Sequence, residues 1–225
     1  MIREAYAKEL QRIQDEVMLL GSMVGDAILK SVEVLKRRDH EGAKCLRKAD
    51  REINQRRYAI ESDVLTLIAT QQPVAGDMRV LAAVLEIATE LERLGDYAKG
   101  IAKISLKIGD EPLIKPLLDL PVMAQKGVDM LRRALDAFAH RDVEQARQIP
   151  HEDDAVDDLY DQVYRELIAI IMGNPRTIDQ ANYLMWAAHN LERTADRVTN
   201  ICERVIFMVT GEMVEIGRKG VREYN

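Results

Sequence analysis

The chain has 225 residues, of which 31% are charged and 47% hydrophobic, with 32 Lys and Arg against 38 Asp and Glu. A net charge of −6 lacks the basic excess of nucleic-acid-binding proteins, and no apolar run approaches the roughly 20 residues that span a bilayer. Two cysteines within helical patterns and the absence of an apolar leader after Met1 indicate a helix-rich protein of the reducing cytoplasm.

Apolar residues recur at helical spacing through the first half of the chain. The first stripe consists of Leu10, Ile13, Val17, Leu20, Val24, Ile28 and Leu35. After a break at 38–40, Asp39 can cap a second helix, and the turn around Pro73 precedes a third helix that Gly109 closes. We predict a second helix to about residue 69 and a third over about 77–107.

The second half follows the same plan. We predict helices over about 122–139, 142–172 and 177–210, and no strands. Asp142 with Gln145, and Thr177 with Gln180, have the spacing of capping boxes. Three prolines between 112 and 121 indicate an inter-domain linker, and a charged tail is expected after Gly211.

The two halves are related by an internal duplication. Leu91–Asp96 returns as Leu191–Asp196 at an offset of 100, and Arg38–Lys44 parallels Arg141–Arg147 at an offset of 103. Long helices with one apolar stripe bury it best in antiparallel bundles. The predicted fold is therefore all-α, with two tandem antiparallel three-helix bundles over 1–111 and 122–225, joined by a linker over 112–121.

Polar side chains form a column beside the apolar stripe of the last helix. At 100° per residue, five potential metal ligands fall on one flank: His189, Glu192, Asp196, Asn200 and Glu203. The preceding helix carries a matching column of Asp153, Asp157 and Asp161. If neighbouring helices bring these columns together, carboxylates converge at one edge of the bundle.

The first half carries a reduced version of the same face. It keeps Glu92 and Asp96, faced by Asp50, Asn54 and Glu61, while Thr89, Gly100 and Lys103 replace the remaining ligands. The neutral Asn54 and the positive Lys103 reduce the attraction for a cation. We therefore predict that the second half binds metal more strongly than the first.

A cation would relieve repulsion within such clusters. Two carboxylates about 5 Å apart repel by roughly 3 kcal/mol at an effective dielectric near 20. Oxygen ligands with an occasional His suit divalent or trivalent ions such as magnesium, manganese, iron or zinc, singly or as a multinuclear cluster. A single Glu-x-x-x-Asp is far more often a solvated helix face. The duplication and the companion columns make a metal site and a solvated face about equally good explanations.

Leu91–Asp96 and Leu191–Asp196 resemble the two signature helices of the phosphate-transport accessory proteins, the PhoU family. Gln72–Arg79 is similar to that family's turn into its third helix, and Asn200–Glu203 to its second-repeat continuation. The resemblance covers nearly the whole chain, in order.

This resemblance implies a cytoplasmic negative regulator of phosphate uptake and the phosphate-starvation response. It implies contact with the ATPase subunit of the phosphate ABC transporter and with a membrane sensor histidine kinase, as well as a homodimer. Metal clusters in the family would map to Asp153 and Asp157 with Glu192 and Asp196, and to Asp50 and Asn54 with Glu92 and Asp96. Asn54 departs from the acidic pattern. We assign partner binding to Asp77, Arg79, Arg93 and Arg193.

Two other functions fit parts of the sequence. His189 and Glu192 invite comparison with ferritin-like metal oxidases, although the family order of Glu before His is reversed here. A passive helical scaffold would need no metal. Since the sequence lacks phosphate-cradling glycine loops and nucleophile motifs, we expect a regulatory adaptor and not an enzyme.

Overall fold

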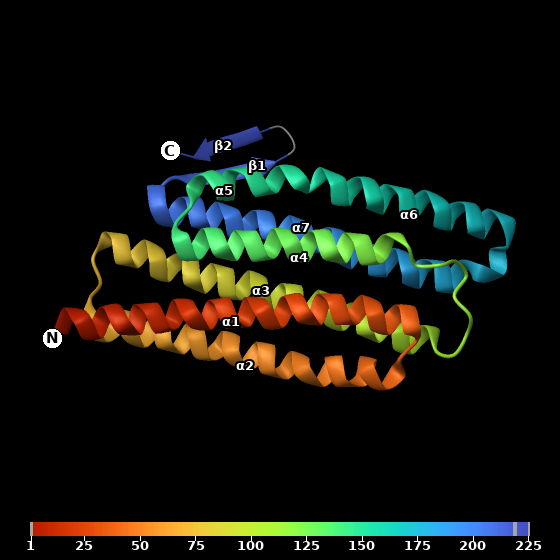
Figure 1. Ribbon diagram of the computed structural model, residues 1–225, viewed down its shortest axis with the longest axis horizontal. Coiled ribbons are helices and arrows are strands. Elements are labelled where there is room, and N and C mark those ends of the chain that lie inside the picture. Colours follow the sequence, from red (N-terminus) through yellow and green to blue (C-terminus); the bar gives the residue numbers. More distant parts are fainter. Residues whose placement is uncertain (1, 218–219, 225) are drawn as a thin grey trace.

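The computed structural model describes residues 2–217 and 220–224, and most of them are helical (Figure 1). The elements are α1 (Ile2–Arg37), α2 (His40–Gln71), α3 (Ala75–Ile108), α4 (Asp119–His140), α5 (Val143–Gln148), α6 (Asp154–Gly173) and α7 (Ile178–Thr210), with 3-10 turns at Ile149–Glu152 and Pro175–Thr177. The predicted all-α fold of two duplicated antiparallel units is confirmed. Among the described helices, none combines the length and apolarity needed to cross a membrane.

The duplication is visible in the backbone at the first helical connection of each half. Arg38 and Arg141 both adopt left-handed backbone angles, with φ of 56° and 57°, directly after α1 and α4. The next residues, Asp39 and Asp142, each accept a hydrogen bond from the amide three positions later, at 2.9 and 3.0 Å. These caps satisfy amides that lack a partner within the helix.

The single helix predicted over 142–172 is wrong. The structure divides it into α5, a 3-10 turn and α6. Pro150 accounts for the break, because proline has no N–H to donate and its ring collides with the carbonyl four residues earlier. As a result, Asp153 and Asp157 lie at the beginning of α6.

The expected charged tail forms a β-hairpin instead. Strand β1 (Met213–Gly217) pairs antiparallel with β2 (Gly220–Tyr224). Val214 and Ile216 alternate with polar residues and are buried, and the Ile216 amide donates a 2.8 Å hydrogen bond to Glu203 Oε1 of α7. The hairpin is therefore attached to the last helix by both apolar and polar contacts.

The linker between the halves is held in place by Gln180. This side chain is buried; its oxygen accepts from the Ile114 amide at 2.6 Å and its nitrogen donates to the Pro112 carbonyl at 3.0 Å. The capping box predicted for Thr177 and Gln180 is wrong, since Thr177 makes no side-chain cap. The glutamine satisfies linker backbone groups in its place.

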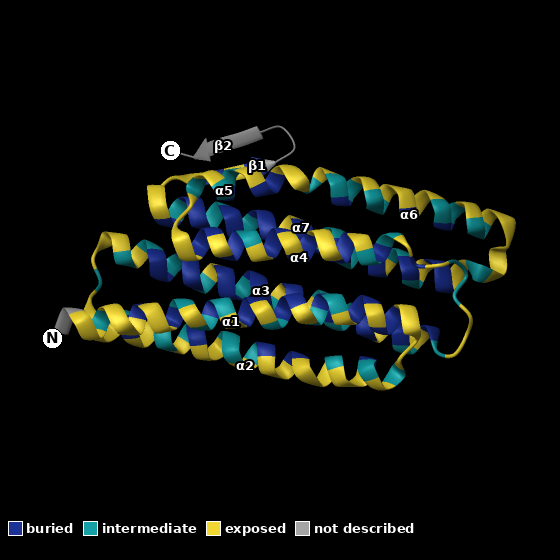
Figure 2. Cartoon of the chain, in the orientation of Figure 1, coloured by how far each residue is buried: buried dark blue, intermediate teal, exposed yellow. Residues whose placement is uncertain are grey.

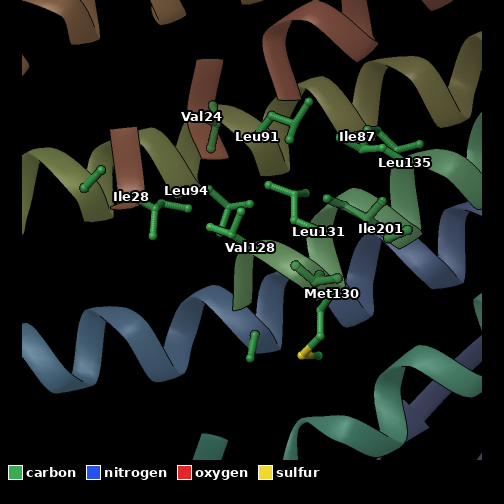
Figure 3. Packing of buried hydrophobic residues seen from close by; sticks show 14 of the residues in the cluster. Val24, Ile28, Ile87, Leu91, Leu94, Val128, Met130, Leu131, Leu135 and Ile201 are labelled. Atoms are coloured by element: carbon green, nitrogen blue, oxygen red, sulfur yellow. The ribbon is translucent and has the colours of Figure 1, made fainter. Parts of the chain in front are cut away.

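One apolar core runs through both halves. Helices α3 and α7 lie side by side at its centre, with α1 and α4 also in contact (Figure 1). Val24 of α1, Leu91 of α3, Leu131 of α4 and Ile201 of α7 belong to the same buried cluster (Figure 3). Exposed residues lie mainly on the outer faces of the helices (Figure 2). The two repeats consequently stabilise each other.

Gly21 permits the close approach of α1 and α4. A Cβ atom at this position would collide with Cδ1 of Leu135. Glycine at such a contact allows two helix backbones to come closer than any side chain would permit.

The shared core predicts a single unfolding transition. Leu131→Ala leaves a cavity beside residues of both halves, so we expect a loss of about 2–5 kcal/mol of unfolding free energy from the whole molecule. Leu65→Ala, at a side chain that is 54% exposed, is the control and should change stability by less than about 0.5 kcal/mol. Denaturant titrations by circular dichroism measure both; two separate transitions, with only one shifted by Leu131→Ala, would contradict the shared core.

Candidate functional site

An acidic cavity of about 620 Å³ lies where the beginning of α6, the second half of α7 and strand β1 meet. Five of the residues predicted as metal ligands line it: Asp153, Asp157, Asp196, Asn200 and Glu203. Strand β1 adds Glu215, and α7 adds Arg193 and Arg197 on the basic side. We call this space the acidic cavity. It combines carboxylates from two helices, as the helical columns predicted.

Glu192 borders this cluster and has an unusual charge state. Its side chain is only 20% exposed. Burial, and then the nearby carboxylates of Asp196 and Asp153, raise its pKa from 4.5 to about 7. Its Oε2 atom lies 3.2 Å from His189 Nδ1 but has no hydrogen bond within the described part of the chain. Glu192 therefore changes its charge close to neutral pH.

His189 lies outside the acidic cavity. Its ring packs against Tyr160 and Trp186, with centroids 6.0 and 5.8 Å away. With Tyr160, Trp186 and Met185 it lines a separate shallow pocket. Burial, followed by the charge of Arg193, lowers the pKa of the imidazole, so the neutral ring is favoured.

Glu203 is partly committed to the hairpin. One of its oxygens accepts the hydrogen bond from the Ile216 amide. Burial raises the pKa of this carboxyl group, while the backbone hydrogen bond acts in the opposite direction. Its second oxygen lies 3.9 Å from Arg204.

In the first repeat, an internal lysine neutralises the predicted ligands. Lys99 Nζ lies 2.7 Å from Oδ2 of Asp50 and 3.0 Å from Oδ1 of Asp96. Asp50 is buried, and Asn54 donates a 3.4 Å hydrogen bond to it. Hydrogen bonding to Asp50, despite partial burial, raises the pKa of Lys99 and keeps it charged. Burial, and then Asp96, raise the pKa of Glu92.

Two cations of the first repeat, Lys99 and Arg57, have uncharged counterparts in the second. At the repeat offset of 100, Thr199 stands in place of Lys99. At the offset of 103, Tyr160 stands in place of Arg57, which pairs with Glu61 at 2.6 Å. Lys103, to which the sequence analysis assigned the neutralising charge, lies in a different groove, between α3 and α7. The positive charge beside the first repeat's carboxylates therefore comes from Lys99 and not from Lys103.

The described side chains are not arranged as a closed metal site. Over residues 2–217 and 220–224, no three His, Cys, Asp or Glu side chains converge closely enough to hold one ion. The donor types nevertheless suit a hard cation, because carboxylate oxygens predominate.

Arg93 and Arg193, predicted to bind partners, make contacts within the chain. Arg93 lies 3.0 Å from the buried Glu90, which also pairs with Arg197 of the other repeat at 3.3 Å. Arg193 lies 5.5 Å above the ring of Tyr97. Glu90, the carboxylate shared by the two repeats, was not among the predicted functional residues, although a Glu on the apolar face of α3 was a signal.

Asp77 and Arg79 lie near the start of α3. Burial and the charge of Asp77 raise the pKa of Tyr6 to about 12. The Arg79 guanidinium lies beside Gly211, the left-handed residue that ends α7. Arg79 therefore lies close to the other repeat.

Comparison with known proteins identifies the family. The PhoU domain family matches the chain twice, over residues 17–105 and 120–205. A phosphate-specific transport system accessory protein PhoU homologue of Clostridium acetobutylicum is 33% identical over 217 residues, covering 96% of this chain and 99% of the relative. The accessory protein PhoU of Escherichia coli is 32% identical over 204 residues, covering 91% and 85%.

Solved structures agree. The crystal structure of the phosphate transport system regulatory protein PhoU from Streptococcus pneumoniae superimposes with a TM-score of 0.86 at 30% identity, covering 93% of this chain and 99% of that one. PhoU from Pseudomonas aeruginosa gives a TM-score of 0.85, also at 30% identity, covering 92% and 99%. Because both sequence repeats and the whole helical arrangement match, the chain belongs to the PhoU family.

Proposed function

We propose that this protein is a cytoplasmic accessory regulator of phosphate uptake that keeps the phosphate-starvation response inactive when phosphate is plentiful. The observation that carries the proposal is the match of both repeats to PhoU relatives named as accessory proteins of phosphate-specific transport. In this role it acts as a homodimeric adaptor at the inner face of the membrane, between the ATPase subunit of the phosphate ABC transporter and a sensor histidine kinase.

An adaptor acts by binding different states of its partners with different affinities. Two features support this role over a ferritin-like oxidase. His189 packs beside the exposed Trp186 at the edge of the bundle, whereas di-iron proteins direct Glu and His into the bundle core. The carboxylates of the second repeat also line the wall of the acidic cavity and not the bundle core. The raised pKa of Glu192 favours a ligand-binding regulator over a passive scaffold.

The proposal includes metal binding by the second repeat. Glu192, Asp196, Asp153 and Asp157 would supply most oxygens, with Asn200, Glu203 and, from the other side of the cluster, His189 as further donors. Burial and the charges of neighbouring carboxylates raise the pKa of Glu192, and a bound cation would stabilise its ionised form against both effects. A bound ion would supply positive charge between α6 and α7, and the side chains would have to turn towards it. The first repeat would bind metal weakly through Asp50, Asn54, Glu92 and Asp96.

The regulatory role predicts a simple phenotype. Deleting the gene should leave the phosphate-starvation genes active in phosphate-rich medium, because the kinase loses its inhibitory contact. Transcript levels in the deletion strain and in a strain complemented with the intact gene provide the measurement. Normal repression in the deletion strain would refute the assignment.

The metal proposal predicts an asymmetry between the repeats. Asp196→Asn should remove more bound metal than Asp96→Asn, since Lys99 already neutralises Asp96. Lys99→Thr, which introduces the residue of the second repeat, should raise the metal content of the first. Elemental analysis of the purified variants gives the answer, with circular dichroism to confirm helix content. Equal losses from the two Asp variants would contradict the asymmetry.

Glu192 predicts a pH dependence of stability in the metal-free protein. Its pKa is about 7 in the folded state, against the ordinary value of 4.5 that we take for the unfolded chain. The folded state favours the protonated carboxyl group, so this stabilisation is complete below the lower value and is lost as pH rises through 7. Glu192→Gln removes this loss. The stability of the variant relative to the parent protein should rise by about 2 kcal/mol between about pH 5 and pH 8.

Urea titrations at several pH values measure this difference. Glu52→Gln, at an exposed glutamate of α2, is the control and should show no such trend. A stability difference for Glu192→Gln that stays constant with pH would show that Glu192 ionises normally.

A further inference from the structure

Helices α3 and α7 enclose an open groove between the two repeats. It has a volume of about 280 Å³ and a mainly apolar lining. Lys103, Ile104 and Lys107 of α3 form one wall, and Tyr183 and Trp186 of α7 the other. We call it the inter-repeat groove; it is separate from the acidic cavity.

The groove depends on Gly100, which lies at one end of it. A Cβ atom at this position would lie only 3.3 Å from Nδ2 of Asn190 on the opposite helix. The corresponding residue of the second repeat, Asn200, carries a full side chain into the acidic cavity. Glycine therefore keeps the inter-repeat groove open where the repeat pattern has a larger residue.

Trp186 is the only tryptophan of the chain and is 55% exposed. Its indole separates the groove from the shallow pocket lined by Tyr160, Met185 and His189. A large aromatic side chain that is exposed to solvent between two pockets offers apolar surface that a partner can bury. Tryptophan is one of the residues enriched among the side chains that contribute most to protein interfaces.

Positive charge lines the other wall of the groove. Lys103 and Lys107 are exposed and stand one helical turn apart on the same face of α3. Within residues 2–217 and 220–224, neither ammonium group forms an ion pair, and Lys107 Nζ lies 5.4 Å from the ring centre of Tyr183. In a chain with a net charge of −6, this pair is a local basic site.

We propose that the inter-repeat groove is a docking site for a segment of a partner protein that presents acidic side chains beside a large apolar one. The carboxylates meet Lys103 and Lys107, and the apolar side chain packs on Trp186 and Ile104. The proposal rests on the adaptor role proposed above, which requires such a contact surface.

The shape of the groove favours a protein segment over a lipid surface. The apolar atoms line a concave groove, which fits a narrow segment, whereas a flat bilayer reaches only protruding side chains. Carboxylates on a protein segment match the spacing of the two lysines directly.

Two synthetic helical peptides test the proposal with the full-length protein. Both lack tryptophan and carry Leu on one face; one has Glu pairs one turn apart beside the leucines, and the other has Lys at those positions. The Glu peptide should bind about tenfold more tightly, measured by fluorescence anisotropy of a labelled peptide and by emission of Trp186.

Variants identify the surface. Trp186→Ala should weaken binding of the Glu peptide about tenfold, and Lys103→Glu with Lys107→Glu should reverse the preference between the peptides. Tyr58→Ala, at an aromatic residue of α2 that is 63% exposed, and Lys30→Glu are the controls and should leave binding unchanged.

Three results would overturn the proposal: equal affinity for both peptides, no effect of the groove variants, or a different occupant. Binding to vesicles of anionic phospholipid that Trp186→Ala abolishes would identify a membrane surface. A concentration-dependent increase in size that the same variant abolishes would identify a second copy of the chain. If repression is normal in the deletion strain while the peptide results hold, the regulatory function fails and the docking site stands.

Discussion

The contact between α3 and α7 determines where the polar groups of this protein can lie. Both helices are more than 30 residues long and lie at the centre of one core that residues from both repeats build. Charged side chains on these two helices therefore lie mainly on the flanks of the seam. Among the described residues of α3 and α7, Glu90 is the buried charged side chain, and it has charge partners from each repeat, Arg93 and Arg197. The acidic cavity and the inter-repeat groove both lie along flanks of α7.

The parts of the fold that local sequence determines were predicted well. The apolar stripes gave the long helices, and Asp39 and Asp142 cap them at equivalent places. The errors occur where a residue responds to distant parts of the chain. Gln180 binds the linker in place of its own helix end, and β1 is ordered by contacts with α7. Pro150 was a local signal for the break in the helix. The strong helical periodicity around it obscured this signal.

The candidate site was predicted in outline for the same reason. A helical wheel correctly placed Asp153, Asp157 and Asp196 beside one space, because neighbouring helices align their flanks. It could not show that His189 packs against aromatic rings at the edge of the column. Nor could it identify Lys99, whose long flexible side chain reaches Asp50 on another helix. A helical wheel shows the direction in which each side chain leaves its helix, whereas the long side chain of a lysine can contact partners in several directions.

Lys99 also separates the responses of the two repeats to their surroundings. In the first repeat the balancing charge is covalently part of the chain, so its electrostatic state is insensitive to small changes in pH or dissolved cations. In the second repeat, the uncharged Thr199 occupies the equivalent position, and the charge of Glu192 changes near neutral pH. The two repeats thus differ in how their charge depends on pH, although α3 and α7 join them in one core. We expect a change of pH near neutrality to alter the charge of the second repeat more than that of the first.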